Sequence, residues 1–109
     1  MKKSSYVRRT EDVNTMGDRV VLFYYLKESK TNERKKYGIE VEMYIQHPDQ
    51  RTVKETKTME NLFSEREKAE KIIDLLCAST VPPITLSEII SDYLDSENEG
   101  AAENLSGIM

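Results

Sequence analysis

The sequence predicts an α+β fold, in which a three-stranded antiparallel β-meander is followed by two short amphipathic α-helices packed on one face. Three observations support this prediction. Apolar residues recur at helical spacing in two segments near the C-terminal end, and a pair of prolines separates these segments. Upstream, one segment alternates between apolar and polar residues with the two-residue period of a strand. A sheet and helices of this kind bury their apolar sides against each other in two layers.

Three strands are expected, and the first covers 20–26, where β-branched and aromatic residues follow one another. The second runs from about Lys35 to Gln46 and directs five apolar side chains to one face: Tyr37, Ile39, Val41, Met43 and Ile45. The third, Arg51 to Thr58, follows a tight turn that contains Pro48. It has a single strong apolar residue, Val53, and many Lys and Thr residues, which is typical of an edge strand.

The first helix is expected to begin after Ser64 and to end near Ala78. Ser64-Glu65-Arg66-Glu67 has the S-x-x-E form of a capping box, in which the Ser and Glu side chains bond to free backbone N–H groups. The apolar residues at i, i+3, i+4 and i+7 form one stripe: Ala69, Ile72, Ile73 and Leu76.

The second helix is expected over 85–94. Thr85-Leu86-Ser87-Glu88 has the form of another capping box. An apolar stripe again follows at helical spacing: Leu86, Ile89, Ile90, Tyr93 and Leu94. Pro82 and Pro83 cannot continue the first helix, so Val81-Pro82-Pro83-Ile84 is expected to connect the two.

The length of 109 residues and the charge distribution predict one domain with two polar ends. Residues 1–18 are expected to form a flexible basic arm, because the segment contains Lys2, Lys3, Arg8 and Arg9 but few apolar side chains. Residues 19–95 form the single α+β domain. Residues 96–109 read as a disordered acidic tail, since 95–109 contains four carboxylates, no Lys or Arg, and few residues to bury.

Composition also indicates the cellular setting. No apolar run approaches the roughly 18–20 residues of a membrane span, and no signal-peptide core follows the N-terminal lysines. One cysteine permits no internal disulfide. We therefore expect a cytoplasmic protein without membrane attachment.

The most informative surface is the face of the sheet opposite the helices. There the first strand directs Val21, Phe23 and Tyr25 outward, and Tyr44 lies beside them on the second strand. Apolar surface left uncovered usually has a partner. Three occupants remain open: the N-terminal segment around Tyr6 and Val7, a second copy of the chain, and a different protein.

A resemblance supports the fold. The segment Tyr37-Gly38-Ile39-Glu40-Val41, the helix from Ser64 to Ala78, and Pro83-Ile84-Thr85-Leu86 with the helix after it are similar to a known family. This is a family of short, uncharacterised bacterial proteins, chiefly from Firmicutes, catalogued as a domain of unknown function. The similarity covers roughly Arg19 to Asp95, and the basic arm and acidic tail depart from the pattern. It implies the fold and a bacterial cytoplasmic setting, and it transfers no active site.

Few residues are suited to catalysis. We therefore expect that the protein is not an enzyme and that it binds no cofactor and no metal ion. His47 is the only histidine and lies in a turn. Cys77 is expected to be a small buried residue at a helix C-terminus, where the helix dipole raises a thiol pKa. Glu40 and Glu42 alternate with apolar residues and read as a solvated strand face.

Nucleic-acid binding is also unfavoured. The two helices are joined by prolines rather than by the short turn of a helix-turn-helix motif, and the second carries Glu88, Asp92 and Asp95 with no Lys or Arg. Phosphates would be repelled by such a surface. The basic loop 27–36 is a better candidate, although Glu28 and Glu33 interrupt it.

Three hypotheses follow. The favoured one is a small non-catalytic protein-interaction or regulatory module that binds a protein partner or itself, as a homodimer, through Val21, Phe23, Tyr25 and Tyr44. The second is an acidic inhibitor or decoy that imitates nucleic acid with its tail and the Glu88/Asp92 surface. The third is a weak nucleic-acid binder that uses the basic arm and the 27–36 loop.

Overall fold

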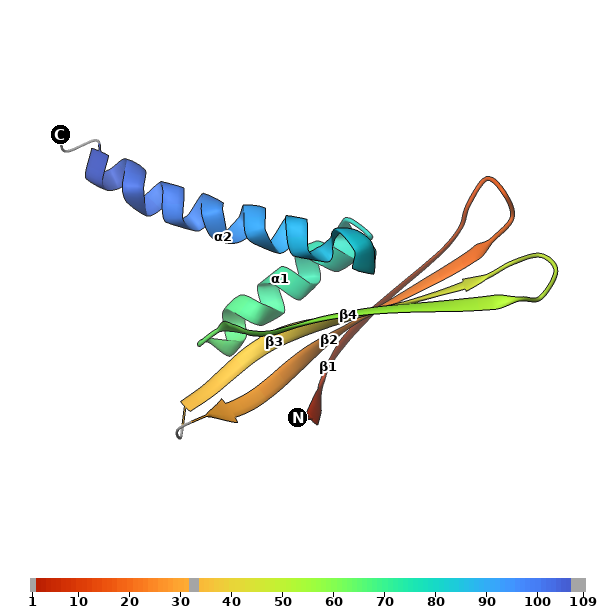
Figure 1. The fold of residues 1–109 in the computed structure, drawn as a ribbon, viewed down its shortest axis with the longest axis horizontal. Helices are drawn as coiled ribbons and strands as arrows, with labels where there is room; N and C mark the ends of the chain where they lie inside the picture. The colour runs from red at the N-terminus through yellow and green to blue at the C-terminus, as the bar shows by residue number, and fades with distance from the viewer. Residues whose placement is uncertain (1, 32–33, 107–109) are drawn as a thin grey trace.

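The structure, a computed structural model, describes residues 2–31 and 34–106, with the side chains of 6–30 and 34–94. The elements are, in chain order, β1 (Lys2–Val13), β2 (Arg19–Thr31), β3 (Arg34–Gln46), β4 (Thr52–Phe63), α1 (Arg66–Ala78) and α2 (Pro83–Ser106). The strands form one antiparallel sheet in the order β1-β2-β3-β4. Both helices lie on one side of this sheet, and the other side is left open (Figure 1). The α+β class and the two helices are confirmed, but the sheet has four strands and not three.

The additional strand is β1, which overturns the expectation of a flexible arm for residues 2–13. Val7 to Val13 pair residue by residue with Tyr25 to Arg19 of β2, after an irregularity between Lys3 and Val7. β1 forms a strand because β2 lies beside it and pairs with its backbone. An edge strand gains its backbone hydrogen bonds from its neighbour, and it needs few apolar side chains of its own. β2 is therefore an interior strand, rather than the edge strand expected from the sequence.

The core lies between the helices and the sheet, as the alternation of β2 and β3 predicts. The buried strand residues are Leu22, Tyr24, Leu26, Tyr37, Ile39, Val41, Met43 and Phe63. The helices contribute Ala69, Ile72, Ile73, Leu76, Leu86 and Ile90. Tyr24 is fully buried, and its hydroxyl donates a 2.9 Å hydrogen bond to the carbonyl oxygen of Val81, which attaches the sheet to the turn between the helices. Burial raises the pKa of Tyr24, so the hydroxyl stays protonated as a donor.

Neither predicted capping box forms. α1 begins one residue later than expected, after Glu65, and no side chain bonds to its N-terminal N–H groups. α2 begins at Pro83, two residues before the expected start. Proline suits the first helical position, because that position has no N–H bond to lose. Instead of forming a capping box, Thr85 donates two hydrogen bonds to the carbonyl oxygen of Pro82. One comes from its backbone N–H and one from its hydroxyl, each at 3.3 Å.

α1 ends in a Schellman motif that contains no glycine. The N–H of Val81 donates to the carbonyl of Leu76 at 3.0 Å, and the N–H of Thr80 donates to that of Cys77 at 3.1 Å. This geometry places Thr80 in the left-handed region, at φ 49°, where a β-branched residue is disfavoured. Val81 is buried beside the core and provides the apolar contact that accompanies such a motif.

Replacing Thr80 by glycine is therefore expected to stabilise the fold by about 0.5–1 kcal/mol. The strain of an L side chain at positive φ, about 1–2 kcal/mol, exceeds the greater backbone entropy of glycine in the unfolded chain. Urea unfolding followed by circular dichroism measures the difference. Thr85→Gly, a substitution inside α2, should destabilise instead, and stabilisation by both changes would contradict the strain explanation.

α2 extends to Ser106, so residues 96–106, which were expected to belong to a disordered tail, are helical. The rest of the expected tail, 107–109, lies outside the described residues. Glu, Ala and Leu favour helix, and Gly100 is the least favourable residue in this stretch. The C-terminal half of α2 projects beyond the sheet (Figure 1). In the described part of the chain, no helix is sufficiently long and apolar to cross a membrane.

Candidate functional site

The open face of the sheet, opposite the helices, carries the four residues predicted to bind a partner. Val21, Phe23 and Tyr25 alternate along β2, and Tyr44 of β3 is paired with Val21 across the strands. The ring centroids of Phe23 and Tyr25 are 6.2 Å apart in a stacked arrangement, and the edge of Tyr44 meets Phe23 at 5.9 Å. All four side chains are half-buried. We call these four residues the aromatic patch.

Cations border the aromatic patch. The Arg9 guanidinium lies 5.8 Å from the ring centroid of Phe23, and the Lys54 ammonium lies 5.6 Å from that of Tyr44. Both distances are in the range of cation–π contacts. Arg9 reaches this position because Arg9 of β1 is paired with Phe23 of β2. The sequence did not indicate this contact, since residue 9 was assigned to a flexible arm.

Two carboxylates of β3 are buried beside lysines on the same face, which corrects the expectation that Glu40 and Glu42 are solvated. Glu40 and Glu42 are only 8% and 6% exposed. Lys27 lies 3.3 Å from Glu40, whose carboxylate also accepts a 2.9 Å hydrogen bond from the Thr58 hydroxyl. Lys54 lies 3.4 Å from Glu42, and the hydrogen bond between them raises the pKa of Lys54. The carboxylates are buried because side chains of β2 and β4 close over them, a cross-strand arrangement that one strand's alternation does not reveal.

A shallow depression of about 490 Å³ opens over the aromatic patch. All four patch residues line it, together with Arg9 and Arg19. Glu11 of β1 pairs with both arginines: it lies 2.7 Å from Arg9 and in a closer contact with Arg19. These bonds lower the pKa of Glu11 and raise that of Arg19, so these two groups stay charged. The site is aromatic at its floor and cationic at one side.

Tyr6 and Val7, the residues expected to fold over the aromatic patch, lie on opposite faces of the sheet. Val7 joins the open face beside Tyr25, but Tyr6 turns to the helix side. There its hydroxyl donates a 2.6 Å hydrogen bond to Asp74 of α1, and the Arg8 Nε donates to the same carboxylate oxygen at 3.0 Å. Desolvation and the bond to Asp74 raise the pKa of Tyr6 to about 12. This network holds β1 to α1 and directs Tyr6 away from the aromatic patch.

The same geometry separates the basic residues of the third hypothesis. Arg8 faces the helices and Arg9 faces the open side, so these two arginines of the expected basic arm do not share one charged surface. In the 27–36 loop, Lys27 is paired with Glu40 and Lys35 with Glu28, the latter at 3.2 Å. Two of the five basic side chains in residues 27–36 are therefore paired with carboxylates.

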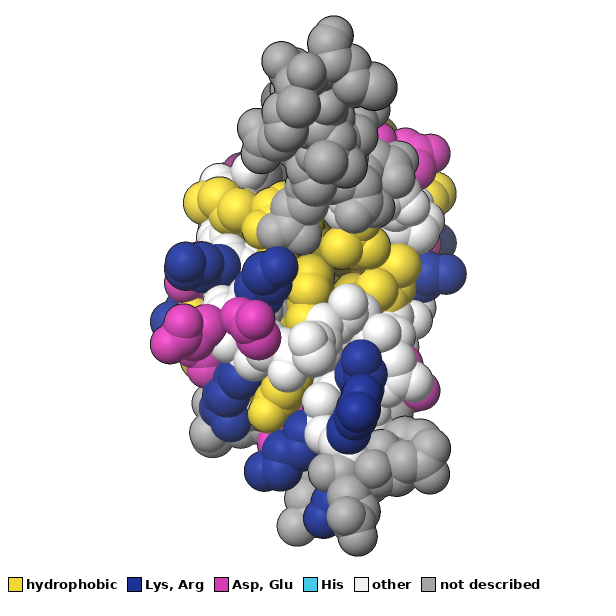
Figure 2. All heavy atoms as spheres, turned by 90° about the vertical axis from the view of Figure 1, so that its left-hand side faces the viewer, with side chains coloured by type: hydrophobic (Ala, Val, Ile, Leu, Met, Phe, Trp, Pro, Cys, Tyr) yellow, Lys and Arg dark blue, Asp and Glu magenta, His cyan; other side chains and the backbone are white. Residues whose placement is uncertain are grey.

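A smaller apolar groove lies between the two helices. Leu75 of α1 is 57% exposed, Ile89 of α2 is 41% exposed, and both line a cavity of about 120 Å³. Figure 2, viewed from the side on which α2 projects, shows hydrophobic side chains gathered on one face with charged side chains around them. The sequence placed Ile89 in the buried stripe, but the structure places it at this groove, 41% exposed.

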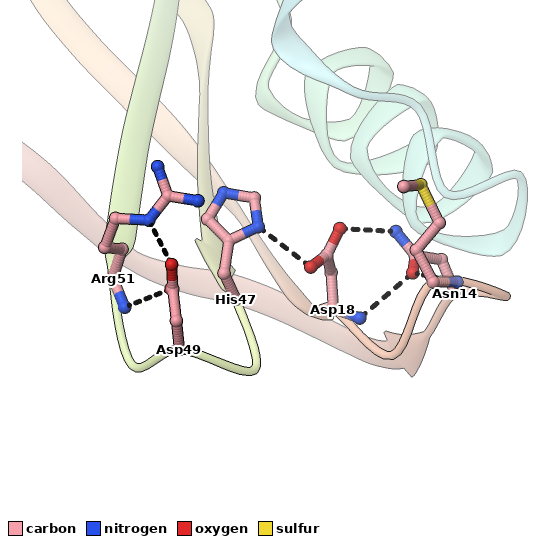
Figure 3. Close-up of polar contacts among 6 residues, drawn as sticks. Asn14, Asp18, His47, Asp49 and Arg51 are labelled. Carbon is pink, nitrogen blue, oxygen red and sulfur yellow. Dashed lines mark hydrogen bonds and ion pairs between the residues drawn. The ribbon is translucent and has the colours of Figure 1, made fainter.

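His47 links the tips of two hairpins, as Figure 3 shows. Its Nδ1 lies 2.8 Å from an Asp18 carboxylate oxygen, across the β1–β2 and β3–β4 turns. Asn14 donates to the other oxygen of Asp18 at 3.2 Å, and its own side-chain oxygen accepts the Asp18 N–H at 3.0 Å. The bond to His47 is the main cause, and that to Asn14 the second, of a lowered pKa at Asp18. The contact between His47 and Asp18 joins the β1–β2 turn to the β3–β4 turn.

The Asp18 contact predicts an acid-dependent loss of stability. A carboxyl whose pKa is lower in the folded than in the unfolded state stabilises the fold above its unfolded value of 3.8, and this contribution disappears as pH falls through the folded value. Wild type should therefore be more stable than Asp18→Asn near pH 6, and the two should converge at strongly acidic pH. Thermal unfolding across this range provides the measurement. In the His47→Ala background, Asp18→Asn should cause a smaller loss of stability near pH 6 than it does in wild type. Parallel pH profiles of stability for wild type and Asp18→Asn would contradict the assignment.

Other candidate chemical groups do not assemble into a site. Cys77 is half-buried beside the core, close to the expected burial, and its sulfur lies 3.9 Å from the carbonyl oxygen of Arg9. Within the described residues, no three His, Cys, Asp or Glu side chains are grouped to hold a metal ion.

Comparison with known proteins places the chain in a family. The model of DUF6514, a family of unknown function, matches residues 3–96. The chain belongs to DUF6514. The DUF6514 match begins within β1, and not at Arg19 as the resemblance suggested, which agrees with β1 being part of the domain. No curated protein and no solved structure matches the sequence.

Proposed function

We propose that this DUF6514 protein is a small non-catalytic interaction module that associates with a second copy of itself through the aromatic patch. The observation that supports the proposal is the asymmetry of the sheet. Two helices cover one face (Figure 1), whereas three half-buried aromatic rings line a depression on the other. Interfaces are enriched in aromatic residues and arginine, and the patch combines three aromatic rings with Arg9 and Arg19.

The setting we propose for the module is the bacterial cytoplasm, as the single cysteine and the Firmicutes resemblance imply. A regulatory role suits a protein of this size that binds without catalysis. Self-association is the more economical form of the proposal, because the interface then requires only the surface that this chain already carries.

The proposal predicts that Phe23→Ser/Tyr25→Ser converts a dimer to a monomer. Both side chains lie on the open face, so their loss removes apolar contact area from the interface while the helix–sheet core stays intact. Light scattering of the full chain across a concentration series measures the mass, and circular dichroism checks that the helices persist. The dimer dissociation constant should rise at least about tenfold, or about 1.4 kcal/mol.

A matched control is Leu75→Ser, which removes an exposed apolar side chain from the helix groove instead. It should leave the dimer unchanged. A dimer that withstands the Phe23/Tyr25 change, or one that Leu75→Ser dissociates, would show that the aromatic patch is not the interface.

A further inference from the structure

We infer that the aromatic patch and the cations around it bind single-stranded nucleic acid, with bases against the rings and phosphates against the cations. The nucleic acid and a second copy of the chain then compete for the same surface. This inference goes beyond the proposed self-association and does not depend on it. It follows from the place of the rings in the sheet, the exposed charge on the open face, and the distance of that face from the acidic helix.

The aromatic rings lie on the two interior strands of the sheet. Phe23 and Tyr25 belong to β2 and Tyr44 belongs to β3, and each of these strands has a neighbour on both sides. A four-stranded sheet whose aromatic side chains stack two or three bases is a general solution for binding single-stranded RNA. The ring centroids are 6.2 and 5.9 Å apart, wider than the roughly 3.4 Å between stacked bases of one strand. The rings therefore suit unpaired bases that are spread apart.

The exposed charge around the rings is positive. Lys54 is 52% exposed, whereas its partner Glu42 is 7% exposed. Arg9 and Arg19 are 47% and 51% exposed, compared with 30% for Glu11 between them. In each pair the carboxylate is thus the less exposed member. Because the arginines and Lys54 lie toward opposite edges of the sheet, an approaching phosphate meets cations on both sides of the rings.

Each of two rings has a cation beside it. The Arg9 guanidinium lies 5.8 Å from the ring centroid of Phe23, and the Lys54 ammonium lies 5.6 Å from that of Tyr44. Bases and phosphates alternate along a nucleic-acid strand, so a strand can offer a base to a ring and a phosphate to the adjacent cation. The depression over the rings, about 490 Å³, lies in the range of ligand pockets, roughly 300–1,000 Å³.

The acidic helix lies away from this surface. α2 contains six carboxylates and no Lys or Arg, and it covers the opposite face of the sheet together with α1 (Figure 1). The repulsion of phosphates that argues against a helical nucleic-acid surface therefore does not apply to the open face. Only the pairing of β1 with β2 brings Arg9 to this face, so the sequence pattern did not indicate the combination of rings and cations.

Salt should act on the two competing equilibria in opposite directions. A dimer formed through two copies of the patch brings two sets of cations together, so screening of these charges tightens it. Nucleic acid instead releases counterions when its phosphates are neutralised, so its binding weakens as salt rises. The nucleic-acid complex should dominate at low salt and the dimer at high salt.

The first experiment measures the anisotropy of a labelled oligouridylate of about ten nucleotides on titration with the full chain at low salt. Arg9→Gln/Arg19→Gln removes two exposed cations, keeps the rings, and should raise the Kd for this probe at least about tenfold. Lys54 is left in place, because its loss would leave the buried Glu42 carboxylate without its cation.

The matched control is Lys57→Gln/Lys71→Gln. It makes the same charge change at exposed positions on the helix side of the sheet, since Lys57 is paired with the buried Val41 and Lys71 belongs to α1. Its Kd should stay within about twofold of wild type, because phosphates contact the other face. Equal losses of affinity in the two double variants would overturn the assignment to the open face.

The contribution of the rings is tested separately. Phe23→Ser/Tyr25→Ser should raise the Kd for oligouridylate at least about tenfold, because stacking on an aromatic side chain is worth about 1–3 kcal/mol per base. A duplex of the same length should bind wild type at least about tenfold more weakly than the single strand, since its paired bases cannot reach the rings. Circular dichroism checks that each variant keeps its helices. A duplex that binds as tightly as the single strand would overturn base stacking.

The outcomes for nucleic acid and for self-association are distinguishable by light scattering with and without excess oligouridylate. Conversion of a dimer to a complex of one chain with one oligonucleotide supports both proposals. A monomer that binds oligouridylate through the rings and arginines supports this inference and shows that the proposed self-association is wrong. A dimer that binds no oligouridylate at low salt, or that binds it without dissociating, shows that this inference is wrong and leaves the dimer proposal intact.

Discussion

Replacing Ile73 by alanine is expected to destabilise the protein by about 3–4 kcal/mol. Ile73 is fully buried at the centre of the α1 stripe, where the helix meets the sheet. The substitution removes the transfer free energy of three methyl or methylene groups and leaves a cavity that close-packed neighbours fill only in part. For a domain with about 5–15 kcal/mol of total stability, this is a large fraction.

Urea unfolding at fixed protein concentration measures the loss. Leu75→Ala is the matched control, because it shortens an aliphatic side chain on the same helix at a position that is 57% exposed. It should cost less than about 1 kcal/mol. Equal losses at the two positions would mean that α1 does not pack against the sheet through Ile73.

Gly38→Ala is expected to cost about 3 kcal/mol for a different reason. Gly38 is buried where β3 and β4 change register between Tyr37 and Ile39. A Cβ added there would collide with the carbonyl oxygen of Met59 and lie 2.8 Å from the Cα of Glu60, and both are backbone atoms of β4. Because backbone cannot swing aside as a side chain does, the strands must separate locally.

Gly17→Ala provides the comparison in the β1–β2 turn. Gly17 has a φ of 84°, but a Cβ there makes only an ordinary contact with Pro48 at 3.5 Å. Its replacement should cost about 1–2 kcal/mol from backbone strain alone. Hydrogen exchange distinguishes the two effects. Gly38→Ala should weaken protection of β3 and β4 amides, and Gly17→Ala should not; unchanged protection in both would contradict the close approach of β4 to Gly38.

The aromatic patch illustrates how far sequence patterns lead to a site. The alternation along β2 and β3 is enough to place Val21, Phe23, Tyr25 and Tyr44 on one face, because side-chain direction in a strand has a fixed period. It cannot find Arg9, whose position over Phe23 depends on a strand pairing. The burial of Glu40 and Glu42 was missed for the same reason, since their cover comes from neighbouring strands.

The sequence by itself determined the features that depend on local periodicity: the α1 stripe, the alternation of β3, the break before α2 and the polar edge strand β4. Tertiary structure alone decided the features that depend on a partner. β1 is a strand because its backbone pairs with that of β2, although its own residues show little alternation of apolar and polar side chains. Helix starts moved because proline and backbone geometry outweighed two capping sequences. Local patterns state which side of an element is apolar, whereas only pairing across the fold determines what meets that side.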